Sequence, residues 1–116
     1  MTRVSPKIRV LLADDHAIVR AGIRQLLEHT GEIEIIAEAS DGLSAQRMIQ
    51  EHKPDVVVLD IQMPKVSGIE VTRWIRTNQL EVGALILTAF DDDPYIMAVL
   101  QAGANGYVLK TAAPVE

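Results

Sequence analysis

The sequence contains no cysteine and few aromatic residues. The lack of cysteine excludes disulfides, thiolate metal sites and cysteine nucleophiles, and it suits a reducing compartment. Phe, Trp and Tyr make up only 3% of the 116 residues, which leaves little material for a surface that stacks on nucleic-acid bases. Because 48% of the residues are nonetheless hydrophobic, we expect a packed core built from aliphatic side chains.

Positive charge and long apolar runs are also scarce. The chain carries 11 basic and 16 acidic residues, a net charge of -5, which is not the charge balance of a nucleic-acid-binding domain. No apolar run reaches the roughly 18 residues that a membrane span needs, and residues 1–7 are not followed by the apolar core of a signal peptide. The length fits one domain, which we expect to be cytoplasmic and to have no membrane partner.

Short apolar runs alternate with segments whose apolar residues recur at helical spacing. Strands are predicted at 8–13, 33–39, 56–59, 84–88 and 106–109, and helices at about 16–28, 42–51, 68–77 and 91–103. Strict alternation with short connections predicts a parallel sheet with helices on both faces and right-handed crossovers. The chain ends before a fifth helix, which is either absent or beyond residue 116.

Within the helices, the sequence also predicts faces and caps. The apolar positions at helical spacing are Ile18, Ile23, Leu26 and Leu27 in the first helix, and Leu43, Ala45, Met48 and Ile49 on one face of the second. Asp41, Ser67 and Asp91 are expected to cap the second, third and fourth helices.

Polar residues stand where the predicted strands end. Asp14 and Asp15 follow the first strand, Asp60 the third, Thr88 closes the fourth and Lys110 the fifth. The carboxyl edge of an open α/β sheet is where ligands bind. Like charges about 4 Å apart repel by roughly 4 kcal/mol at an effective dielectric constant near 20, so the three carboxylates need a cation. Oxygen ligands favour Mg²⁺, with Mn²⁺ possible, and such a site with a lysine and a hydroxyl suits phosphoryl transfer to a nucleophilic Asp60.

Four motifs in register resemble a known family. Leu-Leu-Ala-Asp14-Asp15-His, Val-Val-Val-Leu-Asp60-Ile-Gln-Met-Pro, Ile-Leu-Thr88-Ala and Gly-Ala-Asn-Gly-Tyr107-Val-Leu-Lys110 resemble the response-regulator receiver domains of two-component signalling, over residues 7–111. The residues of these motifs are similar to those of receivers that precede a LuxR/NarL-type DNA-binding domain. The resemblance implies an α/β fold with a doubly wound, five-stranded parallel sheet in the flavodoxin-like order 2-1-3-4-5, a (βα)5 chain whose fifth helix is absent or lies beyond residue 116.

The resemblance also implies a role for the acidic residues. Asp60 would accept a phosphoryl group from a phosphohistidine of a sensor histidine kinase. Asp15 and Asp60 would ligate Mg²⁺ together with the backbone carbonyl of Gln62, and Asp14 would act mainly through a bound water.

Further roles implied by the resemblance concern contact and switching. Lys110 would contact Asp60 or the phosphoryl oxygens. Thr88 would hydrogen-bond a phosphoryl oxygen and move toward it, while Tyr107 changes rotamer to fill the space left behind. Gln62 and Phe90 occupy positions that tune hydrolysis of the phosphoryl group. Many receivers have proline where this chain has Thr111, often after a cis bond, which costs roughly 3 kcal/mol without proline.

The resemblance further implies a domain organisation and partners. Residues 1–116 would form the receiver, residues 111–116 a stub of the fifth helix or a linker, and a DNA-binding output domain would lie outside this chain. The receiver would be a transcriptional regulator's switch that catalyses only its own phosphorylation and dephosphorylation. It would form a homodimer on phosphorylation or through the site of the missing helix, and it would reach DNA only through the output domain.

Three other functions were weighed against the residues. A phosphatase of the haloacid-dehalogenase type needs a second aspartate two residues after its nucleophile, where this chain has Gln62. A nucleotide- or flavin-binding domain needs a glycine-rich phosphate loop after the first strand, and the chain has carboxylates there. A receiver-like dimerisation scaffold stays open. The three histidines share no metal-ligand spacing, and His16 is expected only to decorate the start of the first helix.

Overall fold

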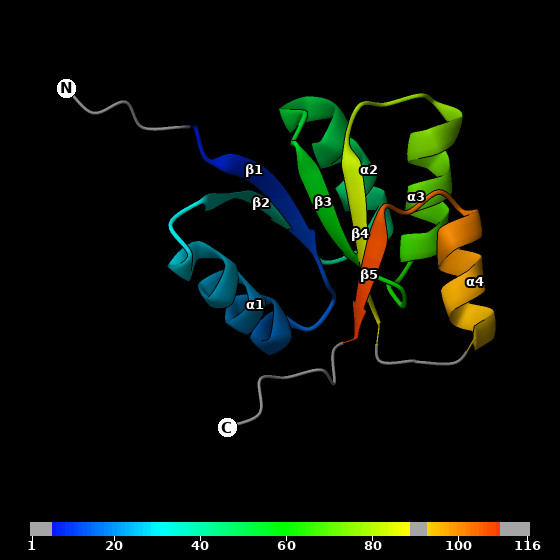
Figure 1. Ribbon diagram of the computed structural model, residues 1–116, viewed down its shortest axis with the longest axis horizontal. Coiled ribbons are helices and arrows are strands. Elements are labelled where there is room, and N and C mark those ends of the chain that lie inside the picture. Colours follow the sequence, from blue (N-terminus) through cyan, green and yellow to red (C-terminus); the bar gives the residue numbers. More distant parts are fainter. Residues whose placement is uncertain (1–5, 89–92, 110–116) are drawn as a thin grey trace.

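Strands and helices alternate along the whole described chain (Figure 1). The computed structural model describes residues 6–88 and 93–109, so Phe90, Asp91, Lys110 and the expected stub 111–116 lie outside it. The elements in order are β1 (Ile8–Ala13), α1 (Ala17–His29), β2 (Ile33–Ala39), α2 (Gly42–His52), β3 (Val56–Asp60), α3 (Gly68–Thr77), β4 (Gly83–Thr88), α4 (Asp93–Gln101) and β5 (Gly106–Leu109). Across the ranges described, no helix has the length and apolar character that a bilayer crossing requires.

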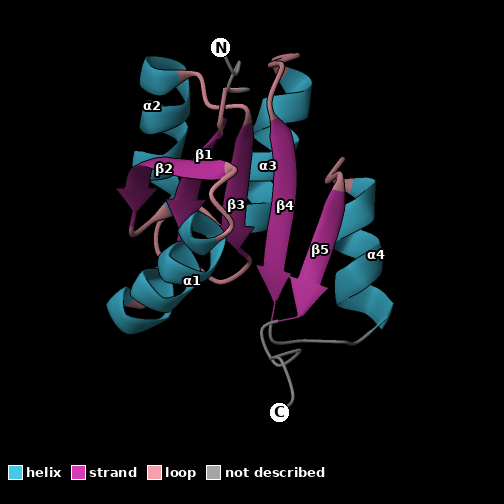
Figure 2. Ribbon diagram, turned by 60° about the vertical axis from the view of Figure 1, so that its left-hand side comes forward, coloured by secondary structure: helices cyan, strands magenta, loops and turns pink. Residues whose placement is uncertain are grey.

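The sheet confirms the predicted topology. All neighbouring strands are parallel, and their order is β2-β1-β3-β4-β5. Figure 2 shows α1 on one face and α2, α3 and α4 on the other. Alternate residues of β1 serve the two faces: Leu11 and Ala13 pack toward α2 and α3, and Val10 and Leu12 pack toward α1. Central strands buried on both faces explain the continuous apolar run of β3.

Two of the three predicted helix caps are confirmed. The Asp41 carboxylate accepts a hydrogen bond from the Ser44 backbone N–H at 2.7 Å, which holds the pKa of Asp41 below its usual value. Ser67 and Glu70 form a reciprocal capping box at the start of α3.

Some predicted apolar positions face solvent instead of the core. In α1, Ile23 and Leu27 pack on the sheet, whereas Ile18 is 88% and Leu26 64% exposed. At 3.6 residues per turn Ile18 lies about 140° around the helix from Ile23, so these residues do not share one face. In α2, Leu43 is likewise exposed, and the buried face is made by its partners in that prediction, Ala45 and Ile49, with Met48 partly buried.

Arg76 of α3 holds the chain between α4 and β5. Its guanidinium donates to the backbone oxygens of Gly103 at 2.7 Å and Val82 at 3.2 Å, and to the side-chain oxygen of Asn105. The same oxygen of Asn105 accepts the backbone N–H of Ala84 at 2.9 Å. The Gly-Ala-Asn-Gly motif is therefore fixed to α3 and to the start of β4.

A tight approach at the start of α3 positions the end of β3. The backbone N–H of Gly68 donates to the carbonyl of Ile61 at 2.9 Å. A Cβ atom on Gly68 would lie only 2.2 Å from the backbone oxygen of Asp60. Only glycine lets the first turn of α3 come this close to Asp60.

A charged cluster joins α1 to β2. Glu38 accepts a hydrogen bond from Arg20 at 2.8 Å and a second from Arg24, which also pairs with Glu28 at 3.3 Å. Partial burial raises the pKa of Glu38, but the two arginine hydrogen bonds outweigh it and hold the pKa below the usual glutamate value.

The contact at Gly68 predicts that Gly68→Ala lowers the free energy of unfolding by about 2 kcal/mol or more, because the added Cβ overlaps rigid backbone. Gly22→Ala is the matched control. No atom lies within 4 Å of a Cβ built there, and alanine in a helix interior is favoured over glycine by about 0.5–1 kcal/mol. Urea unfolding of the two variants should give opposite signs, and equal stability of Gly68→Ala and wild type would contradict the packing described.

The cluster around Glu38 predicts a pH-dependent contribution to stability. Since the folded-state pKa is lowered, the contribution is complete above the ordinary glutamate pKa and is lost as pH falls through the folded-state value. Glu38→Gln should be less stable than wild type near neutral pH by at most about 1 kcal/mol, because the cluster is partly solvated. Urea unfolding over a pH series should show that difference closing in acid. Glu34→Gln, at an exposed position of the same strand, should show no such trend.

Candidate functional site

Two neighbouring strands bring Asp14 and Asp60 side by side. Ala13 of β1 pairs with Leu59 of β3, so the residues that follow them meet at the carboxyl edge of the sheet. Asp14 is fully buried and Asp60 is 5% exposed. The Asp15 side chain, at 28% exposed, lies on the solvent side of the pair. The predicted meeting of the three carboxylates at one edge is present in the structure.

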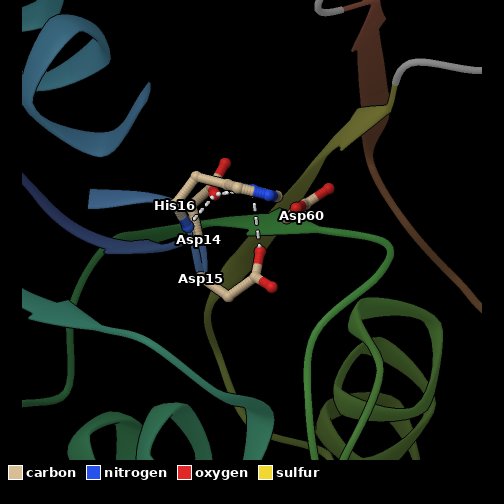
Figure 3. Close-up of side chains that lie close together, drawn as sticks. All are labelled: Asp14, Asp15, His16 and Asp60. Atoms are coloured by element: carbon tan, nitrogen blue, oxygen red, sulfur yellow. Dashed lines mark hydrogen bonds and ion pairs between the residues drawn. The ribbon is translucent and has the colours of Figure 1, made fainter. Parts of the chain in front are cut away.

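His16 joins this group, which the sequence did not predict. Its Nδ1 atom lies 3.0 Å from Oδ1 of Asp15 and 3.4 Å from Oδ1 of Asp14. Figure 3 shows its ring lying across the cluster and pointing toward Asp60. One ligand atom from each of Asp14, Asp15, His16 and Asp60 falls within 4.8 Å of the others.

Local backbone structure explains the position of His16. It is the N-cap residue of α1, with extended φ of -103° and ψ of 108°, and its side chain makes no capping hydrogen bond. Its backbone N–H donates instead to Oδ1 of Asp14 at 2.8 Å. The signal in the sequence was the direct adjacency of His16 to Asp15, because a residue at a turn before a helix can direct its side chain back over the strand end.

Arg20 and the turn after β3 hold the carboxylates in place. Arg20, oriented by Glu38, donates to the backbone oxygen of Asp14 at 2.5 Å. On the other strand, the backbone N–H of Ile61 donates to the carbonyl of Leu87 in β4 at 3.2 Å. Backbone contacts on both sides thus fix the two strand ends against the repulsion of their side chains.

Three other predicted site residues lie on or directly after the strands β3, β4 and β5. Thr88 is the last residue of β4, one position beyond the residue that pairs with Asp60, so its backbone lies at the same edge. Tyr107 lies opposite Ile86 on β5 and is 38% exposed. Gln62 is exposed in the turn directly after β3. Phe90, Lys110 and Thr111 lie outside the described residues.

The donor set fits a hard divalent cation. Ligands about 2.1 Å from an octahedral ion are about 3 Å apart when adjacent and about 4.2 Å apart when opposite, close to the spacing found here. Three carboxylates supply the oxygen atoms that Mg²⁺ and Mn²⁺ prefer. Asp14, Asp15 and Asp60 are therefore the residues that could hold such an ion.

A separate hollow of about 450 Å³ lies at the opposite edge of the sheet. It is formed by the carboxyl ends of α2 and α3 and the segments that lead into β3 and β4. Neither the acidic cluster nor any predicted site residue lines it.

Comparisons with known proteins identify a family for this chain. The family model described as the response regulator receiver domain matches residues 10–116. The chain is 39% identical over 104 residues to the transcriptional regulatory protein DegU of Brevibacillus brevis, covering 90% of this chain and 44% of that protein. It is 42% identical over 106 residues to the oxygen regulatory protein NreC of Staphylococcus aureus, covering 90% of this chain and 49% of that protein.

Solved structures give the same result. The signal receiver domain of the putative response regulator NarL from Mycobacterium tuberculosis superposes with a TM-score of 0.91 at 35% identity, covering 94% of this chain and 88% of that one. The chain spans about half the length of the curated relatives it matches. A family model that covers nearly the whole chain, together with the sheet order and the acidic strand ends, shows that the chain belongs to the response regulator receiver domains of two-component signalling.

Proposed function

We propose that Asp60 accepts a phosphoryl group from a phosphohistidine of a sensor histidine kinase. The observation that carries the proposal is the place of Asp60, almost buried at the end of β3 and within 4.8 Å of the ligand atoms of Asp14, Asp15 and His16. Membership of the receiver family supports the same acceptor. The protein is a switch whose only catalysis is its own phosphorylation and dephosphorylation.

The transfer is a single exchange of bonds at phosphorus. The P–N bond to the kinase histidine breaks as a P–O bond forms to a carboxylate oxygen of Asp60, and the departing imidazole takes up a proton. Hydrolysis later returns Asp60 to its carboxylate and releases inorganic phosphate. Because Asp60 is almost completely buried, few water molecules can reach the acyl phosphate and hydrolyse it.

The acidic neighbours of Asp60 hold a Mg²⁺ ion, with Mn²⁺ as a substitute. Asp15 and Asp60 ligate it directly with the backbone carbonyl of Gln62, and Asp14 acts through a bound water. When bound, the ion offsets negative charge on the carboxylates and the phosphoryl oxygens. The three carboxylates each offer an oxygen atom within 4.8 Å of the others, and oxygen is the ligand that Mg²⁺ prefers, which supports this assignment.

Three residues beyond the acidic cluster respond to the phosphoryl group. Lys110 contacts the phosphoryl oxygens or Asp60, and Thr88 donates a hydrogen bond to one of those oxygens. Tyr107 then changes rotamer, which reshapes the surface of α4 and β5. The end of β4 beside β3 and the half-exposed Tyr107 on β5 support this route.

The whole protein is a cytoplasmic transcriptional regulator. Residues 1–116 belong to the receiver, the expected stub or linker at 111–116 lies outside the described residues, and a DNA-binding output domain belongs to the same whole protein. The named function of the relative DegU as a transcriptional regulatory protein and the coverage of about half of that relative support this organisation. A homodimer forms on phosphorylation or through the face that a fifth helix covers, and DNA is reached only through the output domain.

Intact mass measurement tests the acceptor. Wild type incubated with Mg²⁺ and acetyl phosphate should gain one phosphoryl group that hydroxylamine removes, and Asp60→Ala should gain none. Asp55→Asn, at the opposite end of β3, is the matched control and should be labelled like wild type, because its amide oxygen can still accept the Arg9 N–H bond of 2.8 Å. A chain that binds Mg²⁺ but takes up no phosphoryl group would overturn the proposal and favour a dimerisation scaffold.

A second experiment tests the shielding assigned to Phe90. An apolar side chain two residues after Thr88 is expected to keep water from the acyl phosphate, so Phe90→Glu should shorten the lifetime of the phosphoryl group severalfold. Decay of the labelled protein after removal of the donor measures this lifetime. Leu26→Glu, on the solvent side of α1, should leave the lifetime unchanged. An unchanged lifetime in Phe90→Glu would rule out the shielding role.

A further inference from the structure

The imidazole of His16 lies against the acidic cluster, although α1 does not need it there in order to begin. Nδ1 is 3.0 Å from one oxygen of Asp15 and 3.4 Å from one oxygen of Asp14. Adjacent donors around an octahedral ion with bonds of about 2.1 Å are separated by about 3 Å, so this nitrogen and the Asp15 oxygen have the spacing of neighbouring ligands. Figure 3 shows the same ring directed toward Asp60.

His16 is not used by the helix that it precedes. Its side chain makes no capping hydrogen bond to α1 and is 64% exposed. The backbone N–H of His16 provides the bond to Asp14, and any residue except proline would provide it equally. Among residues 6–88 and 93–109, the ring pairs with the carboxylates of Asp14 and Asp15, which places its nitrogen beside any ion that they hold.

We propose that His16 supplies a nitrogen ligand to the metal site and gives it selectivity for divalent transition ions such as Co²⁺ over Mg²⁺. This inference rests on the proposed function, which places an ion between Asp14, Asp15 and Asp60. Imidazole suits first-row transition ions, whereas Mg²⁺ prefers oxygen and retains water. A nitrogen in an otherwise all-oxygen site therefore strengthens the binding of transition ions and adds little for Mg²⁺.

A competing explanation makes an opposite forecast. If His16 only pairs with Asp15, it occupies a carboxylate oxygen that an ion needs. Removing the imidazole would then strengthen the binding of Mg²⁺ and Co²⁺ together and leave the ratio of their affinities unchanged. The ratio, rather than either affinity alone, separates a ligand from a competitor.

Calorimetric titration with Mg²⁺ and Co²⁺ of the chain purified without a histidine tag, in mildly alkaline buffer, tests the proposal. Loss of even an outer partner of a metal ligand costs about 10- to 100-fold in affinity, so His16→Ala should lower the affinity for Co²⁺ by at least about tenfold. The affinity for Mg²⁺ should stay within about threefold, because water takes the vacated position. His29→Ala, which removes an exposed histidine at the other end of α1, is the matched control and should keep the wild-type ratio.

Two further measurements protect the test. His16→Asn places a residue that caps helices well at this position and should fold like wild type. It should nonetheless show the same loss of Co²⁺ affinity as His16→Ala. Pulsed electron paramagnetic resonance with Mn²⁺ should show nitrogen coupling in wild type and none in either variant. This readout reports the bond itself and does not depend on phosphorylation.

The outcomes distinguish this inference from the function on which it rests. A fall in the ratio of Co²⁺ to Mg²⁺ affinity only in the two His16 variants supports the nitrogen ligand. Wild-type binding of Mg²⁺ with an unchanged ratio in those variants, or without nitrogen coupling, overturns the role of His16 and leaves the magnesium site intact. Failure of wild type to bind either ion overturns both.

Discussion

Mutual repulsion of carboxylates at the end of β1 and β3 is the constraint that the surrounding structure must overcome. Each pair of charges about 4 Å apart costs on the order of 4 kcal/mol at an effective dielectric constant near 20, a large fraction of the stability of a small domain. Asp14 and Asp60 are also nearly out of contact with water. The pairing of the two strands that carry them opposes this repulsion, because Leu11, Leu12 and Leu59 are fully buried and the strands pair in register.

Backbone contacts hold the residues of the acidic cluster in place. The Arg20 guanidinium holds the carbonyl of Asp14, and Glu38 orients that guanidinium from β2. Gly68 lets α3 close against the backbone of Asp60. The strands, α1 and α3 therefore restrain the backbone that carries the carboxylates from three sides. Such a site is prepared to bind positive charge without a large rearrangement.

The sequence predicted the parts of this structure that depend on local patterns. The alternation of apolar runs predicted every described strand and helix, and Asp41 and Ser67 predicted caps that the structure contains. The sequence did not predict the features that depend on tertiary packing. Only one side of α1 meets the sheet, so Ile18 stays exposed, and the orientation of the His16 ring depends on a backbone turn that no apolar pattern encodes.

The cost of the acidic cluster also explains how a local change of charge can act at a distance. A divalent ion that binds only the assembled site stabilises the folded chain by about 2.7 kcal/mol at a concentration one hundred times its dissociation constant. For an ion held by Asp14 and Asp60, that free energy would be available only while the two residues keep their separation, which would couple ion binding to the pairing of β1 with β3. In the proposed function, a phosphoryl group on Asp60 would change the charge at the same point, and β4 is the next strand in register. The closeness of these carboxylates therefore makes this edge of the sheet sensitive to a change of charge.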